Sequence, residues 1–169
     1  NGFKSFAEKT NFLIEDGLTG IVGPNGCGKS NIVESLRWCM GETSAKSMRG
    51  SGMEDVIFSG TSNKPSKNIA EVTISLLNEG KDGPFQYKEL DEIHIRRKIE
   101  KDKGSKFYLN DKEVRAKDAQ MFFADLSTGA HSPSIISQGR IGALVTAKPV
   151  DRRAILEEAA GISGLHARR

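Results

Sequence analysis

A glycine-rich stretch, between an apolar run and a helical pattern, constrains this chain more than any other feature. Residues 23–30 are Gly-Pro-Asn-Gly-Cys-Gly-Lys-Ser. They fit the spacing G-x-x-x-x-G-K-[ST], in which the backbone N–H groups of a tight turn converge on a phosphate. Glycines keep side chains away from those N–H groups, and the helix that follows directs the positive end of its dipole at the same anion. The motif therefore predicts a phosphate-binding loop.

The residues on both sides of this loop have the pattern that such a loop needs. Leu18 to Val22 is a short apolar run typical of a buried strand, and an earlier strand is expected over 9–14, with a turn at 15–17 between them. After the loop, apolar residues recur at helical spacing as far as Met40, and Gly41 stands where a helix would end. The predicted unit is strand, glycine-rich loop, helix.

The rest of the chain alternates between the two-residue periodicity of strands and the periodicity of helices. Strands are expected over residues 56–58, 70–77 and 92–99, a hairpin over 107–114, and a strand end over 134–137. Helices are expected over residues 117–126 and 151–160.

Composition excludes several classes of protein. The 169 residues are 37% hydrophobic and 28% charged, which is typical of a globular domain and not of a disordered tail. No run approaches the roughly 18 apolar residues of a membrane span, and no secretory leader is recognisable, so a cytoplasmic location is expected.

Cys27 and Cys39 are 12 positions apart on the expected helix, or about 18 Å, too far for a disulfide. The scattered histidines predict no metal site.

A catalytic carboxylate is missing from the expected strands. Nucleotide hydrolysis needs an acidic residue after a strand to hold Mg²⁺ and activate water. No run of apolar residues in this chain ends in Asp-Glu, and Asp125 belongs to a helical pattern. We therefore expect a composite site that another segment of polypeptide completes.

Further stretches of sequence narrow the class of protein. The chain carries, in this order, Gly-Phe-Lys-Ser-Phe at 2–6, the loop and Asn at 23–31, Ser-Met-Arg-Gly at 47–50, Met-Glu-Asp-Val-Ile-Phe at 53–58, Ser-Gln-Gly at 137–139, and Asp-Arg-Arg through Glu-Glu-Ala-Ala-Gly at 151–161. Together they resemble the N-terminal head segment of a bacterial SMC chromosome-segregation ATPase, over nearly the whole chain. One departure is Glu42-Thr43, where that family more often has Glu-Gln. It lies outside the phosphate loop.

The resemblance implies a fold and a division of the chain. The implied fold is an α/β P-loop NTPase of the ABC-ATPase head type, with a mixed sheet and an antiparallel flank, incomplete without a C-terminal segment. Residues 1–160 would form the N-terminal half of the head, and residues 161–169 would begin the coiled-coil arm.

The resemblance also implies roles for particular residues. Lys4 and Ser5 would lie near the base or ribose of ATP, and Lys29 would contact the β and γ phosphates. Ser30 and Gln138 would reach Mg²⁺, with Gln138 also near the attacking water and Arg49 placed to stabilise developing charge. The residues expected to hold the phosphates are Gly23, Pro24, Asn25, Gly26, Cys27, Gly28, Lys29, Ser30 and Asn31.

The residues alone leave some of these roles open. Without the resemblance, Gln138 could equally be a solvated loop glutamine and Arg49 a surface arginine. The Cys27 thiol, at a helix N-terminus, could be reactive, but a small filler residue explains it as well.

The resemblance also implies which partners this protein has. The resemblance implies that a C-terminal head segment of the same protein supplies the missing carboxylate, and that two heads clasp two ATP molecules in a homodimer joined through heads and hinge. DNA and kleisin-type accessory subunits are the other expected partners, with no membrane, in a nucleoid-associated protein that hydrolyses ATP for chromosome condensation and segregation. Two alternatives remain open: a DNA repair ATPase of related build, and a nucleotide-responsive clamp without turnover of its own.

A basic segment is a second candidate binding region. The chain has a net charge of +3 and a pI near 8.9, which permits contact with nucleic acid but does not demand it. A cluster of cationic residues on an expected hairpin could contact DNA phosphates, or it could simply be a solvated surface. Its six cationic residues are Arg96, Arg97, Lys98, Lys101, Lys103 and Lys106.

Overall fold

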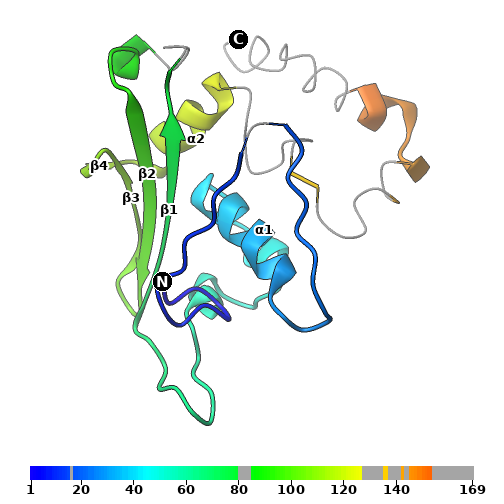
Figure 1. Ribbon diagram of the computed structural model, residues 1–169, viewed down its shortest axis with the longest axis vertical. Coiled ribbons are helices and arrows are strands. Elements are labelled where there is room, and N and C mark those ends of the chain that lie inside the picture. Colours follow the sequence, from blue (N-terminus) through cyan, green and yellow to red (C-terminus); the bar gives the residue numbers. More distant parts are fainter. Residues whose placement is uncertain (16, 80–84, 127–134, 137–141, 143–144, 154–169) are drawn as a thin grey trace.

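A computed structural model describes residues 1–15, 17–79, 85–126, 135–136, 142 and 145–153. In this part of the chain two helices cover one face of an antiparallel sheet, and the other face of the sheet is open to solvent (Figure 1). No helix among the described residues is long and apolar enough to span a bilayer.

Within the described residues the sheet has four strands in sequence order, β1 (Ile69–Leu77), β2 (Glu92–Glu100), β3 (Gly104–Leu109) and β4 (Lys112–Val114). Each pairs with the next in antiparallel register. Asn110 and Asp111 have φ angles of 44° and 64° between β3 and β4, as a tight hairpin turn of the primed kind requires. The strands expected over 70–77 and 92–99 and the hairpin over 107–114 are confirmed.

Helix α1 (Lys29–Cys39) follows the glycine-rich loop, and helix α2 (Ala116–Asp125) follows β4. The helices expected after the loop and over 117–126 are confirmed to within a residue or two at their ends. Gly41 has a φ of 103° just beyond α1, a backbone conformation that suits glycine and ends the helix. Three short 3₁₀ turns connect these elements: η1 (Lys46–Met48), η2 (Met53–Val56) and η3 (Phe85–Tyr87).

The core lies between the helices and the sheet in two adjoining clusters. One surrounds Trp38 at the end of α1, and the other joins α2 to β2 and β3. The first consists of Phe3, Trp38, Met48, Val56, Ile57, Ala70 and Ile99, and the second of Cys39, Met40, Ile93, Ile95, Leu109, Phe122 and Phe123. The first cluster fixes the segment around Phe3 and the loop around Met48 against the helix that carries the glycine-rich loop.

Several expected strands are not formed. Residues 9–14 and 18–22 have no regular secondary structure and pair with no strand among the described residues, and Leu18 and Val22 are 99% and 91% exposed. A strand forms only where neighbouring backbone accepts and donates its hydrogen bonds, and the described part of the chain offers these two segments none. Residues 53–56 form η2, which overlaps the start of the strand expected over 56–58, and Ile57 makes only an isolated bridge to Phe3.

The C-terminal expectations are covered only in part. Ile135 and Ile136 are not in a strand, and the other residues of 134–137 lie outside the described residues. Residues 149–153 are helical, which agrees with the beginning of the helix expected over 151–160. Residues 154–169, including the proposed start of a coiled-coil arm, lie outside the described residues.

Candidate functional site

The glycine-rich loop leads directly into the N-terminus of α1. Residues 23–27 are exposed, and Gly28 is the residue at the helix N-cap, with a φ of 92°. This left-handed backbone favours glycine, and a Cβ here would lie 2.8 Å from Ser5 Oγ and displace that hydroxyl. No side chain caps this helix end, and its first turn holds no acidic residue. The positive end of α1 is therefore open to an anion.

The side chain of Lys29 contacts the backbone of this loop. Its Nζ donates hydrogen bonds to the carbonyl oxygens of Gly23 at 2.7 Å and Pro24 at 2.6 Å. The same ammonium lies 3.9 Å from Cys27 Sγ. The cation is thus held against the backbone of the loop, close to any anion that the loop would bind.

The two cysteines differ in environment. Cys27 is exposed on the loop, whereas Cys39 is fully buried at the end of α1. Burial raises the pKa of the Cys39 thiol to about 12, because the thiolate would lose its hydration. Neither pairs with the other, as the sequence predicts.

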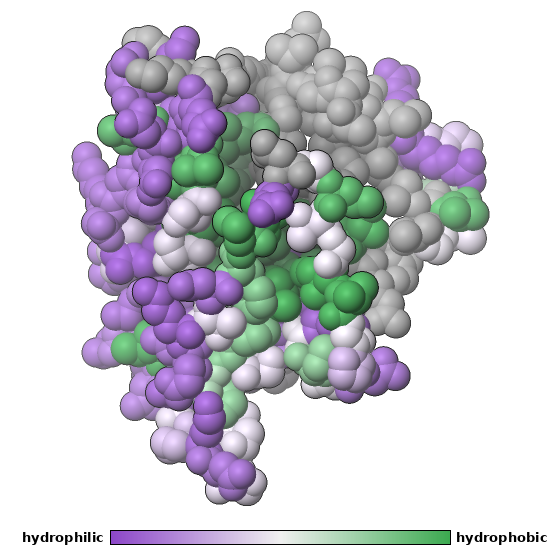
Figure 2. Space-filling view, in the orientation of Figure 1, coloured by the Kyte–Doolittle hydropathy of each residue, from purple (hydrophilic) through white to green (hydrophobic). Residues whose placement is uncertain are grey.

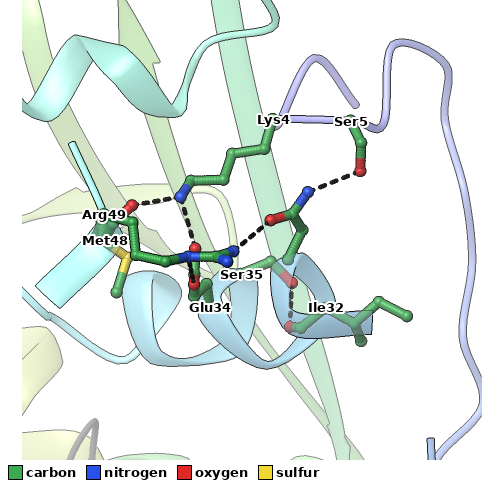
Figure 3. Close-up of polar contacts among 8 residues, drawn as sticks. Lys4, Ser5, Ile32, Glu34, Ser35, Met48 and Arg49 are labelled. Carbon is green, nitrogen blue, oxygen red and sulfur yellow. Dashed lines mark hydrogen bonds and ion pairs between the residues drawn. The ribbon is translucent and has the colours of Figure 1, made fainter. Parts of the chain in front are cut away.

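A polar network surrounds the first turns of α1 and is drawn in Figure 3. Lys4 Nζ lies 2.5 Å from one carboxylate oxygen of Glu34 and also donates to the carbonyl of Met48. Arg49 Nε lies 2.5 Å from the other oxygen of Glu34. One buried carboxylate therefore holds a cation from the N-terminal segment and a cation from the loop after η1.

Asn31 extends this network to the glycine-rich loop. Its amide Nδ2 donates to Ser5 Oγ at 2.8 Å, and its Oδ1 accepts a hydrogen bond from Arg49 Nη2 at 2.8 Å. Four of the residues predicted to contact a nucleotide, Lys4, Ser5, Asn31 and Arg49, thus meet beside the loop although they come from three separate stretches of sequence.

Glu34 is the member of this network that the sequence motifs do not single out. It lies one turn before Trp38 on the same side of α1, and both are buried. The sequence signal that could have identified Glu34 is an acidic residue on the helix face that also buries a tryptophan. A buried carboxylate needs cationic or hydrogen-bonding partners.

Of the two predicted Mg²⁺ ligands, Ser30 is among the described residues. Gln138 lies outside the described residues. Ser30 lies in the first turn of α1, and its contact with Mg²⁺ stays a prediction. The described residues contain no group of three or more His, Cys, Asp or Glu side chains able to hold a metal ion by themselves.

The basic segment is divided between the two faces of the sheet. Arg97 is only 3% exposed and does not belong to an outward surface. Its Nη1 donates to the carbonyls of Trp38 and Glu42, both at 2.7 Å, and the guanidinium stacks on the rings of Trp38 and Phe107. Burial lowers its pKa to about 10. The prediction that Arg97 contacts DNA is therefore wrong, because strand alternation turns it inward with Ile95 and Ile99.

The outward cations are partly paired. Arg96 contacts Asp111 at 2.9 Å and Glu71 at 3.7 Å, and stacks on Tyr108. Lys103 pairs with Glu100 at 2.6 Å and Lys106 with Glu113 at 3.0 Å. Lys98 is half-buried beside them and Lys101 is exposed in the turn after β2.

The fold and the loop together define a head segment of the P-loop NTPase class. The family model described as the RecF/RecN/SMC N terminal domain matches residues 1–139, and the chain belongs to this family. The resemblance to the N-terminal segment of bacterial SMC proteins is confirmed by sequence relatives as well. A chromosome partition protein Smc from Rhodopseudomonas palustris is 55% identical over 169 residues, which is all of this chain and 15% of that protein.

Solved structures agree with this assignment. A structure from work on ATP-driven dimerization and DNA-stimulated activation of SMC ATPases has a TM-score of 0.81 and 33% identity, with 94% of each chain covered. A crystal structure of an Smc head bound to the C-winged helix domain of ScpA has a TM-score of 0.85 and 34% identity, covering 96% of this chain and 49% of that one. The expected fold class, an SMC ATPase head represented only in part, is confirmed.

Proposed function

We propose that this chain is the ATP-binding N-terminal half of an SMC ATPase head, formed by residues 1–160, with 161–169 as the start of the coiled-coil arm. The observation that carries the proposal is the glycine-rich loop at the open N-terminus of α1, with Lys29 held across it. A triphosphate is the ligand whose charge and shape suit such a loop. The chain spans 15% of the Rhodopseudomonas relative, so the proposed activity is that of a longer protein.

The chemistry of the loop fits MgATP. Backbone N–H groups at the start of α1 would hold the phosphates, and Lys29 would move from the loop carbonyls to the β and γ phosphates. Ser30 and Gln138 would each supply one oxygen to Mg²⁺. Bound there, the ion would neutralise charge on the phosphates as the terminal phosphoryl group is transferred to water.

The proposed function needs partners at this site. A C-terminal head segment of the same protein would supply the missing carboxylate, and a second head would close over the nucleotide. Hydrolysis would then drive chromosome condensation and segregation, with kleisin-type subunits bound to the head and dimerization also at the hinge. Support comes from relatives described as chromosome partition proteins, as undergoing ATP-driven dimerization, and as bound to ScpA.

The test is a Lys29→Ala substitution in the full-length protein, with binding of a fluorescent ATP analogue as the measurement. We expect loss of detectable binding, because the substitution removes the cation that faces the phosphates. Lys117→Ala, an exposed lysine on α2, is the matched control and should bind as the unaltered protein does. Unchanged affinity in Lys29→Ala would overturn the proposal, whereas binding and head dimerization without any turnover would favour the nucleotide-responsive clamp.

We also propose that the outward face of β2 and its turn contact DNA phosphates. This face lies on the side of the sheet away from the helices, where Figure 2 shows mainly hydrophilic residues. Among the described residues Lys98 and Lys101 form no ion pair, whereas the other outward cations, Arg96, Lys103 and Lys106, would exchange a carboxylate for a phosphate. A relative described as having DNA-stimulated activation supports this role.

A further inference from the structure

Glu34 has a place in the site that the residue roles given above do not explain. It comes from the second turn of α1, and it is 8% exposed. Burying a carboxylate costs free energy unless charged or hydrogen-bonding groups surround it. Lys4 meets one of its oxygens and Arg49 the other, each at 2.5 Å. Both oxygens of Glu34 are thus used on cations from other segments.

The backbones of these two cations are also unusual. Lys4 has a φ of 45° and Arg49 a φ of 54°, the left-handed region that non-glycine residues seldom adopt. Neighbouring groups hold both conformations, since the Lys4 N–H donates to the Val56 carbonyl at 2.7 Å and the Arg49 N–H to the Lys46 carbonyl at 3.0 Å. A left-handed backbone costs free energy at a non-glycine residue, and it occurs here at the two positions that direct a cation at Glu34.

The geometry of Arg49 shows what the carboxylate achieves. Because Nε of Arg49 is engaged by Glu34, Nη2 is left to reach Asn31 Oδ1 at 2.8 Å. Asn31 directly follows Ser30 and also binds Ser5. The guanidinium is therefore fixed at two points against the helix that begins at the glycine-rich loop (Figure 3). The Arg49 side chain is otherwise 58% exposed, and without these contacts it would be free to move in solvent.

Charge balance leaves the site suited to an anion. Glu34 carries one negative charge between the two positive charges of Lys4 and Arg49, so this cluster of three keeps one net positive charge beside the loop. A neutral residue at 34 would leave two unpaired cations with no fixed position, and the site would become more positive but less ordered.

We propose that Glu34 is a positioning residue for the ATPase reaction, which holds Arg49, and with it Lys4, in place beside the nucleotide. This inference rests on the proposed function, because it gives Arg49 a task at the phosphates. Glu34 itself does not touch the nucleotide. It acts through the two cations, which it holds in ordered positions before the reaction begins.

The experiment compares Glu34→Gln with Arg49→Ala and with the double variant in the full-length protein. We expect Glu34→Gln to lower kcat about tenfold or more, the scale of effect that misplacing a reacting group produces, with a much smaller change in ATP affinity. In the Arg49→Ala background the same substitution should have a much smaller further effect on kcat, because only Lys4 is then left for Glu34 to hold. Glu8→Gln, an exposed glutamate in a separate ion pair with Lys64, is the control and should leave kcat unchanged.

A second variant distinguishes the proposed role of Glu34 from a loss of folding. Arg49→Lys keeps the positive charge at an exposed position but replaces the planar fork, whose Nε and Nη2 meet Glu34 and Asn31, by a single nitrogen. It should therefore reproduce the kcat loss of Glu34→Gln at unchanged thermal stability. The inference is overturned if kcat is unaltered in Glu34→Gln, or if the two single losses multiply fully in the double variant. Either result, with ATP binding still abolished by Lys29→Ala, would remove the role of Glu34 and leave the proposed function standing.

Discussion

At the scale of single residues, Arg97 shows how burial changes the role of a charged side chain. Its guanidinium joins α1 to β2 through the carbonyls of Trp38 and Glu42 and stacks on Trp38 at 4.5 Å. We predict that Arg97→Ala lowers the free energy of unfolding by about 3 kcal/mol, since it leaves two buried carbonyls without a charged donor and opens a cavity. Arg96→Ala, next in sequence but paired at the surface, should cost less than about 1 kcal/mol. Urea unfolding followed by the fluorescence of Trp38, the single tryptophan of the chain, measures both, and equal losses would contradict the structural role of Arg97.

At the scale of elements, the outward face of β2 offers a test of DNA binding. We predict that Arg96→Ala combined with Lys98→Ala reduces the slope of log Kd against log salt concentration, by about 1 for each phosphate that the protein no longer neutralises. Titration of the full-length protein with duplex DNA at several salt concentrations gives the slope. A control on the helical side of the sheet, Lys117→Ala at an exposed position of α2, should leave it unchanged. An unaltered slope in the β2 variant means that this face is merely solvated.

The elements also show what the sequence can predict. Helix α1, the β3–β4 hairpin and the loop at 23–30 are predictable because their apolar periodicity, turn residues and motif spacing are local. The inward position of Arg97 is predictable too, because it alternates in step with Ile95 and Ile99. Residues 18–22 have the pattern of a strand but are unpaired among the described residues, since a strand depends on hydrogen-bonding neighbours that local pattern cannot supply. The Glu34 network is not predictable, because its cations come from two other stretches of chain.

At the scale of the whole molecule, the exposed apolar segments indicate what the described fold lacks. Phe12, Leu13, Ile14, Leu18 and Val22 are all more than half exposed, and Figure 2 shows hydrophobic residues grouped near the centre of the view, over the region where this part of the chain runs in Figure 1. If residues 1–160 are half of a head, the other half should cover these side chains and pair with their backbone. Burying that much apolar surface is strongly favourable, at about 25 cal/mol for each Å². The strand expected at 18–22 would then form only in the complete head.

This reasoning leads to a prediction for hydrogen exchange. Peptides covering residues 18–22 should exchange within seconds in the 169-residue chain, whose backbone there has no strand partner among the described residues. In the full-length protein the same amides should exchange orders of magnitude more slowly, because hydrogen-bonded amides in a core strand open only with much of the surrounding structure. Peptides from β2, which is paired on both sides within this chain, serve as the internal reference and should be protected in both samples. Fast exchange at 18–22 in the full-length protein would mean that no neighbouring strand completes the sheet beside the phosphate loop, and the proposal that this chain is half of a head would fail.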